Sequence, residues 1–88
     1  MINNRRSELE IISKILDLSK NGAKKTELLY QGNFSYTQLK CYLTFLVEKN
    51  FLEENIEKNN GNSGRCYRPT EKGQIFLKDI NKVISYLS

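Results

Sequence analysis

Two helical patterns separated by only a few residues constrain the fold of this chain more than any other feature. The first covers residues 24–31 and draws its buried side from the apolar side chains of Leu28, Leu29 and Tyr30. The segment Gln31-Gly32-Asn33 ends it, because Gly and Asn accept the positive φ of a helix terminus. Two helices around a glycine predict a helix-turn-helix unit, with any compact three-helix packing as the plainer alternative.

The second of these helices, residues 35–49, begins at Ser35, which forms an S-x-x-Q capping box with Gln38. Its apolar residues recur at helical spacing on one face: Leu39, Tyr42, Leu43, Leu46 and Val47. In a helix-turn-helix this helix is the one that enters the major groove of DNA. The opposite, polar face is therefore where base contacts are expected.

The flanking segments complete a recognisable order. Ser7 is expected to cap an amphipathic helix that ends at Asn21-Gly22. After the helix pair, residues 51–57 and 65–68 read as strands around a turn-rich tip at 58–64, and Pro69 closes the second strand. Thr70 then caps a last helix. Helix, helix, helix, hairpin, helix is the order of an α+β winged helix-turn-helix fold with a C-terminal helix.

The 88 residues suit one domain. We expect a basic N-terminal arm at residues 1–6, a winged helix-turn-helix DNA-binding domain at residues 7–69, and a C-terminal helix at residues 70–88. No apolar run reaches the roughly 20 residues that a membrane crossing needs, and residues 1–6 lack the apolar stretch of a signal peptide. The expected location is the cytoplasm, with no membrane partner.

The composition argues against an enzyme. The chain has no His, which removes the commonest general base and metal ligand. Its two cysteines, Cys41 and Cys66, are too few for a zinc site and too far apart for a CxxC pair. No GxxxxGK[ST] phosphate loop is present. We expect no metal, no cofactor and no catalytic residue, and the cysteines are read as ordinary thiols, with a redox pair as the alternative.

Fourteen Lys and Arg against ten Asp and Glu leave a net charge of +4, which favours a polyanionic partner only weakly. The positions of polar and basic residues add to it, because Gln pairs with adenine, Thr touches the thymine methyl, and Lys reaches guanine or phosphate. Plainer roles remain open: Gln38 as a cap, Tyr36 packed on the preceding helix, and the wing as a solvated loop. The candidate DNA-binding residues are Lys24, Lys25, Ser35, Tyr36, Thr37, Gln38, Lys40, Cys41, Thr44, Lys58, Arg65 and Arg68.

The last helix carries a broad apolar stripe. Such a stripe exceeds one packing face, so one edge can seat on the domain while the other meets a partner helix. The alternative is that the whole stripe is core. We expect a homodimer, which would present two recognition helices to two half-sites. The candidate dimerisation residues are Phe76, Leu77, Ile80, Val83, Ile84 and Leu87.

Several segments together resemble a family. The chain is similar to the small archaeal winged-helix proteins in four stretches: Ser7–Ile12, Lys25–Tyr30, Asn33–Tyr36 and Tyr42-Leu43. A fifth stretch, Tyr67–Gly73, resembles that family's strand leading into a T-x-K-G helix start. The resemblance covers residues 7–88. It implies a DNA-binding, chromatin-associated or regulatory protein that dimerises through an antiparallel coiled coil of the C-terminal helix.

We therefore expect a double-stranded DNA-binding protein, either a transcriptional regulator or a nucleoid-associated chromatin protein. The recognition helix 35–49 would enter the major groove, and the wing 58–65 would contact the backbone or minor groove. The first alternative is a protein-interaction module that uses the C-terminal helix and touches no nucleic acid. Double-stranded RNA comes third, because the narrow A-form major groove excludes a recognition helix.

Overall fold

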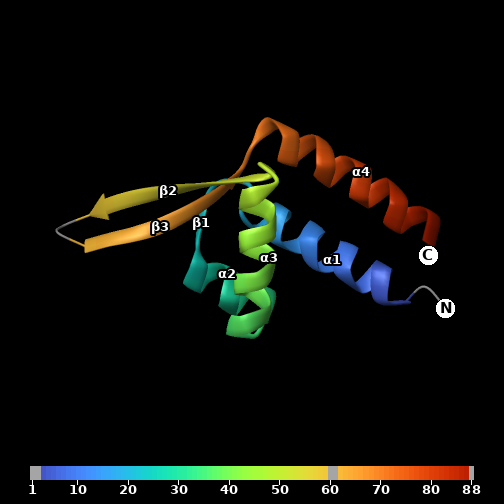
Figure 1. Cartoon of the computed structure of the whole chain (residues 1–88), viewed down its shortest axis with the longest axis horizontal. Helices are drawn as coiled ribbons and strands as arrows, with labels where there is room; N and C mark the ends of the chain where they lie inside the picture. Colours follow the sequence, from blue (N-terminus) through green and yellow to red (C-terminus); the bar gives the residue numbers. More distant parts are fainter. Residues whose placement is uncertain (1–2, 60–61, 88) are drawn as a thin grey trace.

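A computed structural model describes the backbone of residues 3–59 and 62–87 and the side chains of residues 7–56 and 64–87. Four helices accompany a three-stranded antiparallel sheet with strand order β1-β3-β2. This confirms the α+β winged helix-turn-helix arrangement (Figure 1). The elements in chain order are α1 Asn3–Leu18, β1 Ala23–Lys24, α2 Lys25–Gly32, α3 Tyr36–Glu48, β2 Leu52–Asn59, β3 Asn62–Pro69 and α4 Glu71–Leu87.

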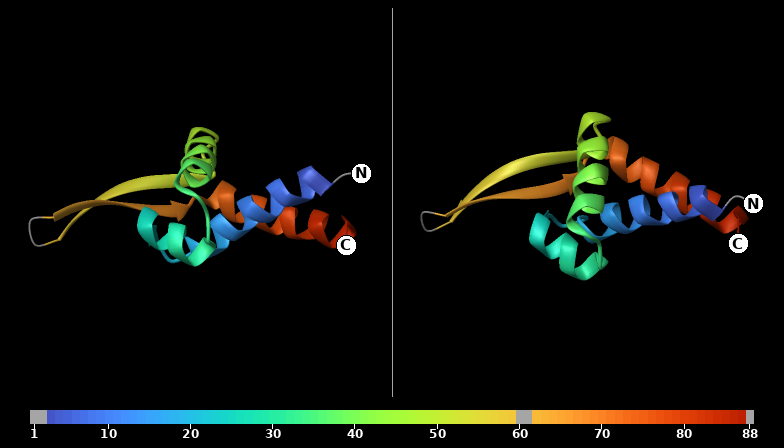
Figure 2. Two further views of the ribbon diagram at one scale, coloured as in Figure 1. Left: turned by 90° about the horizontal axis from the view of Figure 1, so that it is seen from below. Right: turned by 60° about the horizontal axis from the view of Figure 1, so that its bottom comes forward.

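The molecule is elongated, measuring 49 × 27 × 20 Å along its principal axes. The β2–β3 hairpin projects from one end, and α1 and α4 run side by side to the other (Figures 1 and 2). The Ser13 hydroxyl donates to Asn81 Oδ1 at 3.0 Å and joins these two helices. No helix among the residues that the structure describes is both long enough and apolar enough to cross a bilayer.

Helix α1 begins at Asn3, so the prediction that Ser7 caps it is wrong. Residues 3–6 contain neither Gly nor Pro, and two of the four are Arg, a good helix former, so the helix extends through them. The helix also ends earlier than expected, at Leu18. Gly22 lies in the turn that follows. Its φ of 89° confirms the prediction that glycine adopts a positive φ after this helix.

The helix pair shows the Ser35 half of the predicted capping box and the predicted end of α2. The Ser35 hydroxyl accepts the backbone N–H of Gln38 at 3.1 Å, and α3 starts one residue later. Asn33, with φ of 57°, closes α2 in the left-handed region, as the sequence predicted for this segment. Tyr30 is 81% exposed, so only Leu28 and the half-buried Leu29 supply the inner side of α2.

The sheet differs from the expectation in two ways. Strand β1 was not predicted, since two residues carry no pattern; Ala23 pairs with Tyr67 and Lys24 with Cys66. The hairpin strands are also longer than expected, because the ladder continues through Lys58↔Ser63 to Asn59↔Asn62. Backbone pairing does not depend on side chains, so Asn-rich residues extend it. Of the predicted tip, residues 60 and 61 lie outside the described residues.

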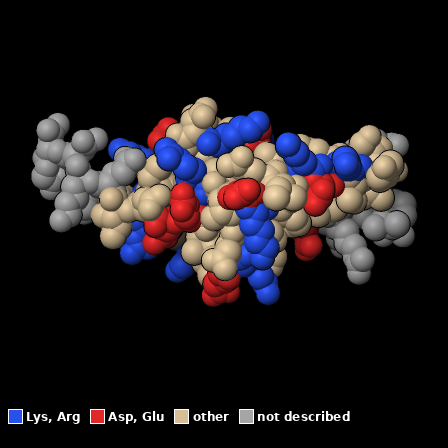
Figure 3. Space-filling model, turned by 90° about the horizontal axis from the view of Figure 1, so that it is seen from above, with Lys and Arg blue, Asp and Glu red and all other residues tan. Residues whose placement is uncertain are grey.

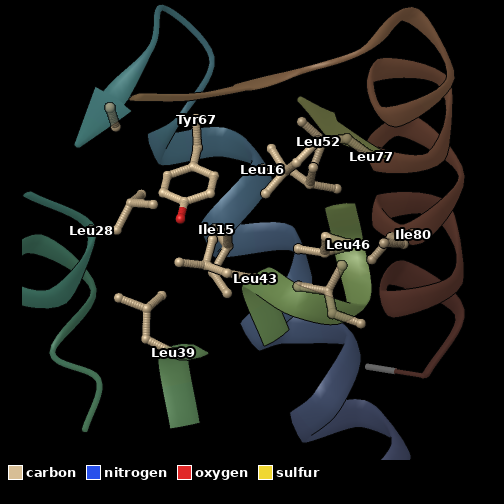
Figure 4. Packing of buried hydrophobic residues seen from close by; sticks show 12 residues of the cluster. Ile15, Leu16, Leu28, Leu39, Leu43, Leu46, Leu52, Tyr67, Leu77 and Ile80 are labelled. Atoms are coloured by element: carbon tan, nitrogen blue, oxygen red, sulfur yellow. The ribbon is translucent and has the colours of Figure 1, made fainter. Parts of the chain in front are cut away.

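The core lies between α1, α2, α3, α4 and the base of the sheet. Figure 4 shows Leu43 of α3 beside Ile15 of α1, and Leu46 of α3 beside Ile80 of α4. The most deeply buried large apolar side chains are Ile15, Leu16, Leu28, Leu39, Leu46 and Leu52. Burying Leu39, Leu43 and Leu46 fixes the rotation of α3 and leaves its polar face outward.

Helix α4 is attached to the end of the helix pair. The Thr70 hydroxyl accepts the backbone N–H of Gly73 at 3.0 Å, which confirms Thr70 as the cap. The same hydroxyl donates to the Asn50 carbonyl at 2.5 Å, and the Thr70 N–H donates to the Phe51 carbonyl at 3.1 Å. Phe51 stacks on Phe76 with ring centroids 4.0 Å apart. These contacts fix the direction in which α4 leaves the wing.

Candidate nucleic-acid interface

The outward face of α3 carries the polar residues that the sequence placed there. Because Leu39, Leu43 and Leu46 turn inward, the residues between them in the helix are exposed, except the half-buried Tyr42. Those exposed are Tyr36, Thr37, Lys40, Cys41, Thr44 and Glu48. Phe45 is also 40% exposed and was not expected on this surface. Among these residues Lys40 supplies a positive charge and Glu48 a negative one.

Ser35 and Gln38 take part in the capping of α3. The Gln38 backbone N–H is held by Ser35, and the Gln38 side chain is half-buried near Phe34 and Lys14 in a groove between α1 and the start of α3. The capping interaction for Ser35 is therefore present. Gln38 is less exposed than Thr37 or Lys40.

Lys25 and Tyr36 join the start of α2 to the start of α3. The Lys25 ammonium donates to the Tyr36 hydroxyl at 3.3 Å and lies 4.4 Å from the centre of its ring. This hydrogen bond, with the charges of Lys25 and Lys40, lowers the pKa of Tyr36 below its ordinary value. Tyr36 thus contacts α2 and still leaves 58% of its surface exposed.

A hollow of about 240 Å³ separates α3 from the base of the wing. Its apolar floor comes from Leu43 and Val47 of α3 and from Tyr67 of β3. Three cations and two carboxylates stand around it. The full lining is Lys25, Lys40, Leu43, Thr44, Val47, Glu48, Glu54, Arg65 and Tyr67.

One wall of the hollow is an ion pair on the wing. Arg65 Nη1 lies 3.5 Å from Glu54 Oε1. Burial, the hydrogen bond to Glu54 and the Glu54 charge together raise the pKa of Tyr67 to about 12. Sequence reasoning had named Arg65 but neither Glu54 nor Tyr67. The exact pairing in the hairpin, which the sequence left open, decides that Glu54 faces Tyr67.

Two of the predicted basic residues lie on the other face of the sheet. Successive side chains alternate between faces along a strand, and paired residues share a face. Tyr67 faces the hollow, so its neighbours Cys66 and Arg68 face away from it. Lys24 pairs with Cys66 and therefore lies on that same opposite face. The structure therefore does not bring Lys24 and Arg68 together with α3.

The remaining wing candidate, Lys58, lies in β2 opposite Ser63 rather than in a loop. Its side chain is outside the described residues. In the view of Figure 3, Lys and Arg side chains alternate with Asp and Glu and do not form one continuous basic patch.

Comparison with known proteins decides the family. A profile of winged helix-turn-helix proteins matches residues 5–88. The chain belongs to the winged helix-turn-helix family. An uncharacterised protein of Methanocaldococcus jannaschii is 34% identical over 55 residues, which cover 61% of this chain and 57% of that protein. The match thus spans just over half the length of this curated relative.

Solved structures share the fold of this winged helix-turn-helix protein. Sso10a-2, a DNA-binding protein from Sulfolobus solfataricus, has a TM-score of 0.75 at 28% identity over 89% of this chain and 78% of its own. A PadR family transcriptional regulator from Eggerthella lenta has a TM-score of 0.79 at 16% identity, covering 99% of this chain and 81% of its own. The second likeness, at that identity, concerns the fold alone.

The apolar stripe of α4 divides between the inside and the outside of this winged-helix domain. Leu77 and Ile80 are in the core, and Phe76 and Ile84 pack against it. Val83 and Leu87 remain 43% and 38% exposed. Two residues that the sequence reading omitted are more exposed still: Ile75 at 57% and Tyr86 at 84%. The free apolar edge of α4 is therefore not centred on the predicted residues.

The cysteines of the winged-helix domain are not bonded to each other. Cys41 is exposed on α3, and Cys66 is buried on the face of β3 that turns away from α3. Within the part of the chain that the structure describes, no three His, Cys, Asp or Glu residues are grouped as metal ligands.

Proposed function

We propose that this winged-helix protein binds double-stranded DNA through α3 and the base of the wing, as a transcriptional regulator or a nucleoid-associated chromatin protein. The observation that carries the proposal is the grouping of Lys25, Lys40 and Arg65 around one hollow beside the polar face of α3. When a recognition helix lies in the major groove, cations beside it can neutralise backbone phosphates while the side chains of the helix reach the bases.

The side chains of α3 suit the major groove in different ways. Lys40 reaches guanine or a phosphate, and Thr44 one turn further along offers a hydroxyl and a methyl group to a base pair. Thr37 and Cys41 lie on the same exposed face. Lys25 and Tyr36 stand at the N-terminal end of α3, where backbone phosphates would pass. The hairpin would follow the backbone or the adjacent minor groove.

The test compares two variants that carry the same charge change. Lys40→Glu with Thr44→Glu places negative charge on the outward face of α3. Gln74→Glu with Lys78→Glu makes the same change on exposed positions of α4. We expect the α3 variant to lose binding to a fluorescent duplex and the α4 variant to retain it. Equal loss in both, or none in the α3 variant, contradicts the proposal.

The exposed edge of α4 supports a second element of the proposal, a two-fold homodimer. Ile75, Asp79, Lys82 and Tyr86 follow the i, i+4, i+7, i+11 spacing and form one stripe on α4. An antiparallel pairing whose two-fold axis crosses the exposed face of α4 at the level of residues 80 and 81 would set Ile75 against the partner's Tyr86 and Asp79 against the partner's Lys82. The stripe is thus complementary to itself in charge and in apolar character.

A cross-linking experiment tests this pairing in a Cys41→Ser background. Ile75→Cys together with Tyr86→Cys should give a covalent dimer on oxidation. Either substitution alone should not, because each position faces the other one across the axis. A monomer in sedimentation, with no cross-link in the double variant, contradicts the pairing. If duplex binding is absent as well, the protein is an interaction module that takes another partner on α4.

A further inference from the structure

Glu54 is a carboxylate held among the cations of the site, and DNA binding gives it no evident role. Glu54 pairs with Tyr67 across the hairpin, and Arg65 lies diagonally from it on β3. Long side chains on one face of a sheet reach across such a diagonal. The contact is made, with Arg65 Nη1 3.5 Å from Glu54 Oε1.

A second contact holds the carboxylate in place. Glu54 is the partner of the buried Tyr67 across the hairpin, and burial together with the interaction with Glu54 raises the pKa of the Tyr67 phenol to about 12. The Glu54 side chain is only 32% exposed, whereas that of Arg65 is 66% exposed. Glu54 thus lies between a buried phenol and an exposed guanidinium, and the guanidinium is the partner that solvent or a ligand can reach.

A DNA phosphate that enters the hollow meets a cation already engaged. It has to draw Arg65 away from Glu54, and Glu48 adds a second negative charge on the α3 side of the same hollow. Binding that does not depend on sequence draws its free energy from such phosphate contacts. Contacts from α3 to base edges do not involve Arg65 and are affected less.

We propose that Glu54 competes with DNA phosphates for Arg65 and is thereby a specificity-determining residue, one that restrains binding to unrelated sequence. The inference rests on the proposed DNA binding. It assigns the ion pair a role in discrimination, and not in stability, because an ion pair as exposed as this one stabilises a fold by at most about 1 kcal/mol.

The test is Glu54→Gln, which keeps the shape of the side chain and its capacity to accept from Tyr67. Its matched control is Glu53→Gln, which removes the same charge one residue away on the opposite face of β2. The probe is a random duplex of about 30 base pairs, followed by fluorescence anisotropy over a range of salt concentrations.

We expect Glu54→Gln to tighten binding to the random duplex on the order of fivefold at low salt, the factor that the loss of about 1 kcal/mol of competing ion pair gives. The slope of log K against log salt should steepen by about 0.9 for each protein chain bound, because Arg65, no longer paired with Glu54, neutralises one more phosphate. Glu53→Gln should change neither quantity. In an Arg65→Gln background, Glu54→Gln should lose its effect.

Three results overturn the inference. One is an equal gain in both single variants, which assigns the effect to net charge. Another is weaker binding by Glu54→Gln, which would make Glu54 a residue that positions Arg65 for DNA. The third is a gain that survives in the Arg65→Gln background. If the unaltered protein binds no duplex at low salt, the proposed function itself fails, and that outcome is distinct from all three.

Discussion

Gly73, at the start of α4, offers a sharp test of how this helix is joined to the wing. A Cβ at Gly73 would lie 1.9 Å from the Phe51 carbonyl oxygen and 2.9 Å from its carbonyl carbon. An ordinary contact between such atoms is about 3.5 Å. The Phe51 carbonyl already accepts the Thr70 N–H at 3.1 Å, and Phe51 stacks on Phe76, so this backbone is held from two sides.

Two opposing effects set the magnitude for Gly73→Ala. Helix propensity favours Ala over Gly by up to about 1 kcal/mol. Overpacking against a fixed backbone costs about 3 kcal/mol, the upper end of the usual range. We therefore expect a net loss of about 2 kcal/mol, which lowers the Tm of a domain of this size by about 8–16 °C.

Thermal and urea unfolding followed by circular dichroism measure the loss, with Gly64→Ala as the matched control. No heavy atom lies within 4 Å of a Cβ at Gly64. That variant should stay within about 0.5 kcal/mol of the unaltered protein. A Gly73→Ala protein as stable as the unaltered one, or more stable, would show that α4 does not approach Phe51 as described.

Three further predictions concern caps and ionisation. Ser35→Ala should lower the free energy of unfolding by about 1 kcal/mol, measured in urea, since it leaves the Gln38 N–H without its acceptor; an unchanged midpoint contradicts this. Tyr67 ionises near 10 when unfolded and at about 12 when folded, so its contribution to stability is complete below pH 10 and is lost between pH 10 and 12. The unfolding midpoint should therefore decrease as the pH rises from 10 to 12, and Tyr67→Phe should make that decrease smaller. Lys25→Met should raise the pKa of Tyr36 in an NMR titration, because the first cause of its lowering is removed; no movement would refute the contact.

Local sequence signals anticipated the helices and two of their N-terminal caps. Ser35 and Thr70 act within three residues of the backbone groups that they bind, so short patterns reveal them. The same locality explains the failure at Ser7, whose capping pattern competes with a helix that starts earlier. Strand β1 is too short for any pattern and exists only because β3 lies beside it.

The candidate interface was less accessible to sequence reasoning, because it depends on register and packing. A one-residue change of register would move every side chain of a strand to the other face. Register is what separates Arg65, beside α3, from Arg68, behind the sheet. Likewise the broad stripe of α4 could not reveal that Leu77 and Ile80 pack into the core while Ile75 and Tyr86 stay outside.

The most direct test of the account is a salt titration of the unaltered protein on a random duplex of about 30 base pairs, compared with a duplex selected for tight binding. We expect log K to fall linearly with log salt. We also expect this negative slope to become shallower by about 0.9 for each phosphate contact removed by Lys40→Gln. Tighter binding to the selected duplex would indicate a regulator, and equal binding an architectural protein. Absence of binding at low salt, or a slope unchanged in Lys40→Gln, would contradict the assignment of α3 and the base of the wing as the DNA-binding surface.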